Sequence, residues 1–546
     1  MKIKVLNKEV VLKEGTTLED LAKELNITNA IAATVDGRLR ELTFKLTKDH
    51  SAVEFLDLSN TDAVRIYEAS LRYVFAMATY NLYPEVKLRF NYSISRSILA
   101  VFEGYDSVPE EMLENIKQEV DRIIATNYPI QRMKVSKEEA IKIYESLGLE
   151  DKINILKYRP ENTVNLYQTN AYQNYMYSYM VPSTGYLTKY KAFNYHPGFI
   201  IQYPRAEFNG TIPPFVDAPT FGQALRDVAK WGKVIGGNTI SNINAYGATK
   251  DLRVEFINLC ETKHNNQLAS LSQQILANIE DIRLIAVAGP SSSGKTTFTN
   301  RLKISLLSLG IKPVMISIDD YYLGKEEAPK DEHGKPDLEH VEALDLELFN
   351  RDILDLIQGK EVTLPKFNFQ TGKREEGRKI KVDKNSPILI EGIHALNERL
   401  TSSIPKHQKF KIYIAPQTQL HIDNHNPISI TDLRLLRRSV RDQKYRNSPV
   451  TSTMDMWSSV RRGEFKWIYP YQEEANFVFN SELTYEFSVL KQFALPHLQA
   501  IPSEDVHYIT ANRLVKFLKY FNDIEPDLVP NNSILREFIG GSPFHD

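Results

Sequence analysis

The residues with the clearest chemical potential form a Gly/Ser-rich loop between an apolar run and a segment with helical periodicity. The small and basic residues of this loop are Gly289, Ser291, Ser292, Ser293, Gly294, Lys295, Thr296 and Thr297. Glycines at both ends let the backbone wrap around an anion, and the loop N–H groups and the helix N-terminus supply positive potential. A lysine here reaches β/γ-phosphate oxygens, and the threonine after it binds Mg²⁺ through its hydroxyl. We interpret the loop as a site for ATP with Mg²⁺.

Carboxylates follow two further apolar runs. Asp319 and Asp320 end the run 314–318, and Glu391 ends the run 387–390. Phosphoryl transfer needs positioning, charge neutralisation and an acceptor for the proton of the attacking hydroxyl. Asp319 is our candidate for that acceptor, and Glu391 is our candidate for a Mg²⁺ ligand, direct or through water. Helix capping or a solvated turn is the alternative for both aspartates.

Arginines recur at helical spacing beyond these carboxylates, namely Arg434, Arg437, Arg438, Arg441 and Arg446. Such a run is usually a solvated basic face. In a chain with a phosphate-binding loop it is equally suited to a lid that neutralises charge in the transition state. The residues alone leave both interpretations open.

These side chains need a scaffold that brings strand ends together. Apolar runs at 284–288, 314–318 and 387–390 alternate with helical patterns, which predicts a parallel sheet with right-handed crossovers. Because ligands gather at the carboxyl ends of such strands, we expect the loop and the carboxylates on one edge of the sheet.

The rest of the chain divides into further units. Residues 1 to about 60 combine short alternating runs with a helix start at Thr17 and an Asp36-Gly37 hairpin turn, which predicts a small β-grasp fold. A tyrosine-dense α+β segment follows, and a helical pattern spans residues 252 to 280. The predicted domains are 1–62, 63–250, a linker helix over 251–281 and a P-loop α/β domain over 282–546. The dense tyrosines, which either pack or line a binding cleft, include Tyr172, Tyr175, Tyr177, Tyr179, Tyr186 and Tyr190.

Composition sets outer limits on function. The chain has 546 residues, 42% hydrophobic and 25% charged, which favours several soluble domains with sizeable cores. A net charge of −2 gives no global electrostatic case for nucleic acid or an anionic membrane. A single cysteine, Cys260, excludes an intramolecular disulfide and a Cys-pair zinc site. Because no apolar run is long enough for a signal peptide or a membrane span, we expect a cytoplasmic protein with no membrane partner.

Residues 282 to about 500 resemble the uridine kinase and phosphoribulokinase family of P-loop kinases. Besides the loop, four segments carry the resemblance: a segment with the general base, one that contacts ribose, a magnesium-contacting strand end and a lid helix. In this sequence they are Ile318-Asp319-Asp320-Tyr321-Tyr322, residues 337–345, Leu389-Ile-Glu391-Gly392 and residues 435–442.

The resemblance implies roles for individual residues. Asp319 would take the acceptor proton, and Thr296 and Glu391 would hold Mg²⁺. The substrate would contact Asp319, Tyr322, Glu339, His340, Phe367 and Arg441, and the arginines that close over the transferring group would be Arg437, Arg438 and Arg441.

Two departures concern the substrate. Glu339 stands where uridine kinases usually carry an aspartate. In place of the family's Tyr-Asp-Phe stretch and the base-contacting histidine after it, this chain has Phe367-Asn368-Phe369 and then Gly372. A base could stack on Phe367 or Tyr322, but the hydrogen bonds that would read a pyrimidine edge are not evident.

The N-terminal half carries a second resemblance. Residues 1 to about 60 look like a TGS domain, and about 65 to 235 resemble the editing-type domain of threonyl-tRNA synthetase. In that alignment the synthetase's His-x-x-x-His pair becomes Tyr73 and Met77, and its later Cys and His become Met176 and Met180. None of these side chains is a good zinc ligand or general base. We therefore expect the fold to survive with its pocket filled or repurposed and without editing chemistry.

Three functions remain under consideration. The first is an ATP-dependent, uridine kinase-like enzyme that phosphorylates a nucleoside 5′-hydroxyl. The second is a kinase of another small alcohol such as a sugar phosphate, as in the phosphoribulokinase branch. The third is an RNA-associated regulatory ATP-binding protein, which a basic, salt-sensitive face would favour. Mixed charge over residues 1 to 60 argues mildly against a nucleic-acid partner, and the sequence leaves the acceptor and homo-oligomerisation open.

Overall fold

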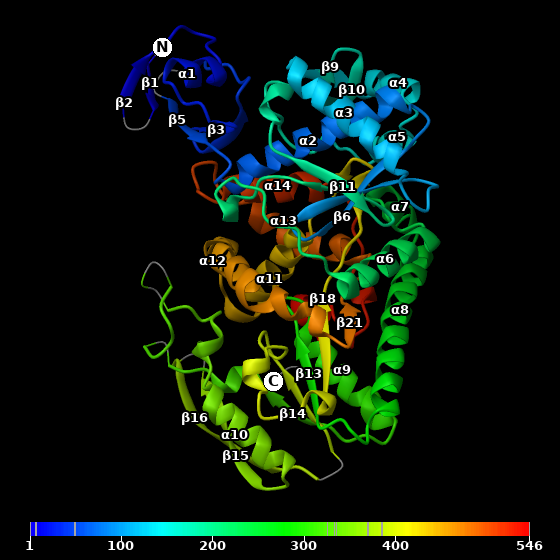
Figure 1. Cartoon of the computed structure of the whole chain (residues 1–546), viewed down its shortest axis with the longest axis vertical. Coiled ribbons are helices and arrows are strands. Elements are labelled where there is room, and N and C mark those ends of the chain that lie inside the picture. The colour runs from blue at the N-terminus through cyan, green and yellow to red at the C-terminus, as the bar shows by residue number, and fades with distance from the viewer. Residues whose placement is uncertain are drawn as a thin grey trace.

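The structure is a computed structural model that describes residues 2–5, 8–47, 51–324, 326–331, 334, 336–368, 371–383 and 386–544. A small N-terminal unit and a larger α+β unit lie at one end of the molecule, and a parallel α/β sheet lies toward the other end (Figure 1). None of the helices in these described ranges is long and apolar enough to cross a membrane.

The N-terminal unit is a mixed five-stranded sheet with one helix, in strand order β2-β1-β5-β3-β4. Thr17 begins the helix, because its hydroxyl accepts a hydrogen bond from the Asp20 N–H at 3.1 Å. Asp36 and Gly37 adopt positive φ in the turn between β3 and β4, as the Asp-Gly pair predicts. The elements are β1 (Lys2–Val5), β2 (Lys8–Val11), α1 (Leu18–Glu24), β3 (Ala32–Val35), β4 (Arg38–Glu41) and β5 (Ser51–Leu56).

The second unit packs two antiparallel sheets, β11-β12-β7-β6 and β10-β9-β8, with four helices. Its first helix is largely buried, as its apolar sequence requires. The helices are α2 (Thr61–Leu82), α3 (Glu110–Thr126), α4 (Lys137–Ser146) and α5 (Glu150–Leu156). The strands are β6 (Leu88–Ile94), β7 (Ser97–Phe102), β8 (Gln131–Ser136), β9 (Thr163–Thr169), β10 (Tyr172–Asn174), β11 (Lys191–Tyr195) and β12 (Gly198–Gln202).

The residues that replace the synthetase's editing side chains lie in the core of this second unit. Tyr73, Met77, Met176 and Met180 are all buried in one hydrophobic cluster. The Tyr73 hydroxyl donates to the backbone carbonyls of Tyr172 and Tyr167, at 3.3 and 3.4 Å. These four side chains therefore fill the interior, as the sequence predicts.

The C-terminal half is built on a five-stranded parallel sheet in the order β14-β17-β13-β18-β21. The fully buried central strand, β13, leads into the phosphate-binding loop. The strands are β13 (Leu284–Ala288), β14 (Val314–Ser317), β17 (Ile388–Glu391), β18 (Lys409–Ala415) and β21 (Phe477–Asn480), with the hairpin β15 (Glu361–Asn368) and β16 (Lys373–Lys381) beside them. The helices are α9 (Lys295–Ser308), α10 (Leu346–Ile357), α11 (Ile430–Arg446), α12 (Val450–Gly463), α13 (Glu486–Gln499), α14 (Tyr508–Leu518) and α15 (Arg536–Ile539).

The predicted linker helix is integral to the C-terminal core. Helix α8 (Lys250–Ala277) runs along one side of the molecule (Figure 1). Its Phe256, Leu271 and Ile275 pack in the same buried cluster as the central sheet. Helices α6 (Pro219–Val234) and α7 (Ile240–Tyr246) adjoin it, and Ile240 and Ile243 belong to that cluster. The cores thus do not separate at residue 250, because apolar side chains from both sides of that position share one interior.

A short hairpin joins the two halves of the molecule. Strands β19 (His421–Asp423) and β20 (Asn426–Pro427) form it. The Lys152 ammonium of α5 pairs with the Asp423 carboxylate at 2.8 Å, and both side chains are fully buried. Further bonds to the hairpin come from Arg72, Arg89, Phe90, Asp151 and Tyr177. We call residues 421–427 the latch hairpin.

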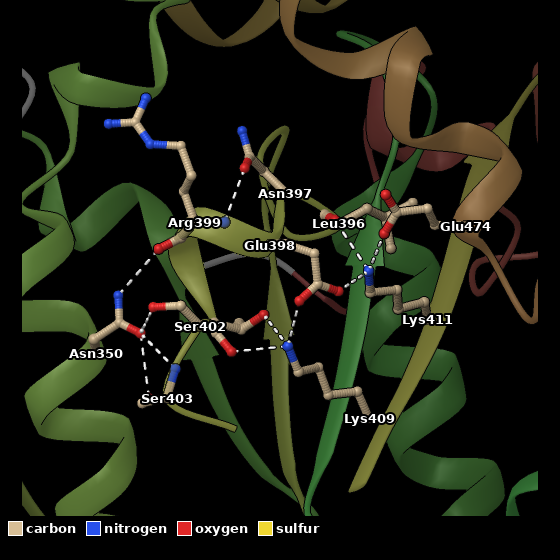
Figure 2. Close-up of polar contacts among 11 residues, drawn as sticks. Asn350, Leu396, Asn397, Glu398, Arg399, Ser402, Ser403, Lys409, Lys411 and Glu474 are labelled. Atoms are coloured by element: carbon tan, nitrogen blue, oxygen red, sulfur yellow. Dashed lines mark hydrogen bonds and ion pairs between the residues drawn. The ribbon is translucent and has the colours of Figure 1, made fainter. Parts of the chain in front are cut away.

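The opposite end of β18 carries an ion network in which two buried lysines meet two partly exposed glutamates (Figure 2). Lys409 donates to the Glu398 carboxylate at 2.7 Å and to the Thr401 carbonyl at 2.8 Å. Lys411 pairs with the same Glu398 and with Glu474. Because Lys409 pairs in register with Leu284 at the start of β13, the network lies at the amino-end edge of the sheet, away from the phosphate-binding loop.

Candidate active site

The phosphate-binding loop has a backbone that only small residues allow. A Cβ on Gly289 would lie 1.9 Å from the Ile414 carbonyl oxygen, so any side chain there would displace β18. Ser292 and Gly294 adopt φ of 59° and 88°, the left-handed region. These turns bring the chain directly into the N-terminus of α9, where free N–H groups and the helix dipole favour an anion.

The donors on this loop fit a chain of phosphates. The hydroxyls of Ser292 and Ser293 are buried, and neither has a hydrogen-bond partner within the part of the chain that the structure describes. The Lys295 ammonium lies against the loop, 3.0 Å from the Gly289 carbonyl oxygen and 3.3 Å from that of Pro290. Buried donors without partners are costly unless a ligand satisfies them, which fits a phosphate-bearing group at this position.

Two of the predicted arginines hold the loop from behind. The Arg434 guanidinium donates to the Ser291 carbonyl at 3.0 and 3.1 Å and pairs with Glu464. Arg437 pairs with Glu486 at 2.6 Å, with both side chains fully buried. Arg437 also lies 3.4 and 3.5 Å from the Ser292 and Ser293 carbonyl oxygens. A lid needs mobile cations, so the geometry of Arg434 and Arg437 fits a rigid support instead.

The side chains of the other arginines of α11 are more exposed to solvent than those of Arg434 and Arg437. Arg438 donates to the Ser291 hydroxyl at 3.0 Å. Arg438, Arg441 and Arg446 all pair with Asp442, at 3.3, 2.8 and 3.5 Å. Arg441 is thus tied to Asp442, whereas Arg438 combines that pair with a contact to the loop.

Asp319 lies where the sequence places it, just after β14. The Ser317 hydroxyl caps this turn by accepting from the Asp319 N–H at 3.3 Å. Burial raises the pKa of Asp319, nearby Lys295 and Arg446 oppose that rise, and Asp320 adds to it. Asp320 instead accepts from the Phe367 N–H at 3.2 Å and so fastens the hairpin β15–β16.

Glu339 and Tyr322 join the same cluster. Burial raises the pKa of Glu339 to about 7, Glu464 adds to the rise, and Arg438 and Lys295 oppose it. The Glu339 side chain packs on Gly463. A Cβ added at Gly463 would lie 2.4 Å from the Glu339 Cβ, so only glycine fits there. Burial, followed by Asp319 and Glu339, raises the pKa of Tyr322 far above its usual value.

An aromatic wall stands beside this cluster. The rings of Tyr322 and Phe367 lie 5.9 Å apart, centroid to centroid. The His340 ring lies 4.2 Å from that of Trp467, and its Nδ1 accepts from the Glu342 N–H at 3.0 Å. Phe369, part of the departure noted in the sequence, lies outside the described residues.

Thr296 and Glu391 flank the loop on two elements. Thr296 lies in the first turn of α9, and Glu391 pairs in register with Val287 and Ser317 at the carboxyl edge of the sheet. Among the described residues no cluster of three or more His, Cys, Asp or Glu could hold a metal ion. This donor set fits Mg²⁺, which binds through few protein groups together with phosphate oxygens and water.

Three neighbours of the site, Glu537, Ile534 and His394, were not identified from the sequence. The Glu537 carboxylate of α15 accepts a hydrogen bond from the Thr297 N–H at 3.0 Å. Ile534 packs on Gly294, where an added Cβ would lie 2.4 Å from Ile534 Cγ2. His394 is buried beside Glu339, and burial lowers its pKa to about 3, so it is neutral. No local pattern marks Glu537, because it lies 240 residues beyond its partner.

Comparisons with known proteins bear on both halves. Residues 284–487 match the Phosphoribulokinase / Uridine kinase family. The N-terminal region is 31% identical over 190 residues to a threonine–tRNA ligase of Clostridium kluyveri, covering 34% of this chain and 30% of that protein. The ligase of Syntrophomonas wolfei is 30% identical over 183 residues, covering 33% of this chain and 28% of its own. This chain therefore spans under a third of the length of these curated relatives.

A solved structure also aligns with part of this chain. A structure described as "a Possible Uridine Kinase from Bacillus stearothermophilus" is 19% identical, covers 40% of this chain and 98% of its own, and has a TM-score of 0.28. The chain therefore combines a segment, residues 284–487, that matches the Phosphoribulokinase / Uridine kinase family with an N-terminal region that is similar to threonine–tRNA ligases.

Proposed function

We propose that this protein is an ATP- and Mg²⁺-dependent nucleoside kinase. The observation that carries the proposal is the position of Lys295, whose ammonium lies 3.0 Å from the Gly289 carbonyl oxygen of the phosphate-binding loop. It is close enough to Asp319 and to Glu339 to oppose the rise in pKa that burial gives both carboxyl groups. A base for the acceptor hydroxyl, a cation for phosphate and a carboxyl for further hydroxyls are what transfer to a sugar alcohol requires.

Each residue has a task in this proposal. ATP supplies the phosphoryl group and Mg²⁺ neutralises its charge, held by the Thr296 hydroxyl and Glu391. Lys295, the loop N–H groups and the buried hydroxyls of Ser292 and Ser293 bind phosphate oxygens. Asp319 accepts the proton of the acceptor hydroxyl, and because burial raises its pKa it is a stronger base than an exposed aspartate.

The aromatic pair near Asp319 supports a nucleoside as the acceptor. Tyr322 and Phe367 offer aromatic faces on which a nucleobase can stack. Glu339 can accept hydrogen bonds from the paired hydroxyls of a ribose, which a sugar phosphate also carries. The aromatic pair is therefore the feature that favours a nucleoside, and it would be surplus to a sugar phosphate.

An acceptor screen tests the proposal. ADP release from ATP-Mg²⁺ would be measured with a panel of nucleosides and sugar phosphates, using wild type, Asp319→Asn and Asp320→Asn. We expect one nucleoside to raise turnover, Asp319→Asn to lower kcat by about 100-fold or more, and Asp320→Asn to stay within about fivefold. The Asp320 variant is a matched control because its amide oxygen can still accept from Phe367.

The other results separate the remaining functions. Turnover with a sugar phosphate alone would move the assignment to the phosphoribulokinase-like alternative. Binding of ATP without turnover on any acceptor would favour a regulatory ATP-binding protein.

A further inference from the structure

A second polar site lies between the N-terminal units and helix α14. It is a cavity of about 610 Å³, within the usual range for small-molecule sites. Its walls come from β4, the start of α2, strands β8 and β9, the segment 175–179 and α14. None of its lining residues belongs to the candidate active site.

The cavity is strongly basic. Its lining includes eight lysines and arginines but only two carboxylates, Asp62 and Glu161. Alternation along strands produces part of this charge, because residues two apart share one face. Arg38 and Arg40 repeat in this way on β4, and the matching pair on β8 is Arg132 and Lys134.

Helix α14 supplies the facing wall by a different periodicity. Tyr508, Asn512 and Lys516 recur every four residues along it, and Arg513 lies next to this stripe. Residues spaced by four lie on one side of a helix, so the stripe faces the basic strands. Three separate regions of the sequence thus direct cations into one space.

The protein matches only part of this positive charge. Four of the eight cations pair with carboxylates, namely Arg65 with Asp62, Arg132 with Glu41, Arg159 with Glu161 and Arg513 with Asp432. Burial and the charges of Arg132 and Arg40 lower the pKa of Lys516. The Nε atoms of Arg40 and Arg513 are buried and have no hydrogen-bond partner in the described part of the chain. A group of like charges with unused donors favours the binding of a further anion.

Aromatic rings complete the lining. Tyr175, Tyr177 and Tyr179 come from one segment, and Tyr508 lies on α14. The Arg132 guanidinium lies 5.2 Å from the Tyr179 ring centroid, and that of Arg38 lies 5.7 Å from the Tyr508 ring. Tyrosine faces and flat guanidinium groups are the surfaces on which planar nucleobases stack.

We propose that this cavity binds a small nucleotide carrying two or more phosphates, with its phosphates on the converging cations and its base against the tyrosines. The volume suits one such molecule. Bidentate arginine contacts to phosphate oxygens supply the affinity, and stacking distinguishes a nucleotide from a bare polyphosphate.

Calorimetric binding to the full-length protein tests this. The probes are GTP, tripolyphosphate, guanosine and a 12-nucleotide single-stranded RNA. The protein carries Lys295→Ala throughout, so that the phosphate-binding loop contributes little. Two variants of this protein, Arg132→Ala and Lys134→Ala, each remove one cation from the cavity. A third, Lys142→Ala, removes one cation from an exposed position of α4 and is the control. Thermal unfolding of each variant confirms folding.

The expected result is saturable GTP binding that each cavity variant weakens about tenfold and Lys142→Ala leaves unchanged. Tripolyphosphate should bind several-fold more weakly than GTP, and guanosine weakest of all. Three results would overturn the proposal: GTP affinity equal in cavity variants and parent, tripolyphosphate affinity equal to that of GTP, or RNA affinity tenfold tighter than that of GTP. The last would make this face a nucleic-acid surface.

Discussion

Burial moves two carboxyl groups of the candidate active site toward their neutral forms, and their neighbours give them different tasks. Asp319 lies close to Lys295, and Glu339 lies between Arg438 and the carboxylates Glu464 and Asp337. A pair of acids in unlike surroundings is typical of sites that use one as a base and the other to orient substrate. The assignment of Glu339 to orientation leads to a pH dependence.

The pKa of Glu339, raised by burial to about 7, predicts how acceptor binding varies with pH. Ionised Glu339 accepts hydrogen bonds from hydroxyl groups more strongly than the neutral acid does. The acceptor KM should therefore fall by roughly fivefold as pH rises from 6 to 8. Glu339→Gln should have a higher KM and no such trend, measured by acceptor titrations at each pH. Parallel profiles for the two proteins would assign the titration to another group.

Arg437 should act on stability rather than selectively on turnover. Its pair with Glu486 is fully buried, and removing one partner of such a pair costs about 3–5 kcal/mol. Arg437→Ala should lower the free energy of unfolding by that amount in urea titrations. Arg438→Ala should cost under about 1.5 kcal/mol, because only a pair with Asp442 and one bond to Ser291 are lost, yet lower kcat. Equal stability of the two variants would contradict this division.

At the scale of elements, the C-terminal helix α15 touches the loop that would bind nucleotide. The Glu537 carboxylate accepts from an N–H group in the first turn of α9, which is also where a phosphate would bind. Its negative charge opposes phosphate there. Glu537→Gln should therefore tighten ATP binding by about three- to tenfold, measured by calorimetry. Glu525→Gln is the control. It also removes one negative charge from the C-terminal part of the chain, but Glu525 pairs with Arg253, so ATP affinity should stay unchanged.

The ion network at the start of β18 should give a pH-dependent contribution to stability (Figure 2). Burial opposes ionisation of Glu398, but hydrogen bonds from Lys409 and Lys411 outweigh it and lower the pKa. An acid with a lowered pKa in the folded state stabilises the fold above its unfolded pKa and loses that effect as pH falls through its folded pKa. Glu398→Gln should cost about 1–2 kcal/mol at pH 7, and the difference from wild type should shrink below about pH 4.5.

How much could be predicted from the sequence depends on the range of the interactions. The phosphate-binding loop, the strand ends at Asp319 and Glu391 and the Thr17 helix start follow from neighbours in the chain, so local patterns reveal them. The ion pair of Arg437 with Glu486 joins residues 49 positions apart, and the Glu537 contact spans 240. Helical spacing shows that arginines share a face but not what that face meets. It therefore left a solvated basic face and a lid open, and it did not predict the support that Arg434 and Arg437 give the loop.

At the scale of the whole molecule, two polar links join the N-terminal units to the helix that supports the phosphate-binding loop. The latch hairpin ends three residues before α11 begins. The Tyr177 hydroxyl of the second unit donates to the Arg513 carbonyl at 2.7 Å, and Arg513 pairs with Asp432 in the first turn of α11. The same helix carries Arg434 and Arg437, which hold the loop carbonyls. Both N-terminal links therefore reach the loop through one rigid element.

The pair of Lys152 with Asp423 is the most buried part of this connection, so it offers the sharpest test of how the halves depend on each other. Lys152→Met leaves a buried carboxylate without its cation and should cost about 3–5 kcal/mol. Because the latch hairpin precedes α11 directly, the variant should also raise the KM for ATP. Asp423→Leu in the same protein should restore part of the stability, since an apolar pair can replace a buried ion pair.

Calorimetry and kinetics on the single and double variants show whether the Lys152–Asp423 pair couples the two halves of the molecule or stabilises only its surroundings. If the hairpin locks the two halves, Lys152→Met should split the thermal transition into two, and the double variant should bring the two transitions closer together. A single transition shifted down with an unchanged KM for ATP would mean that the pair stabilises only its surroundings. The shared core of α7, α8 and the central sheet would then hold the halves together by apolar packing alone.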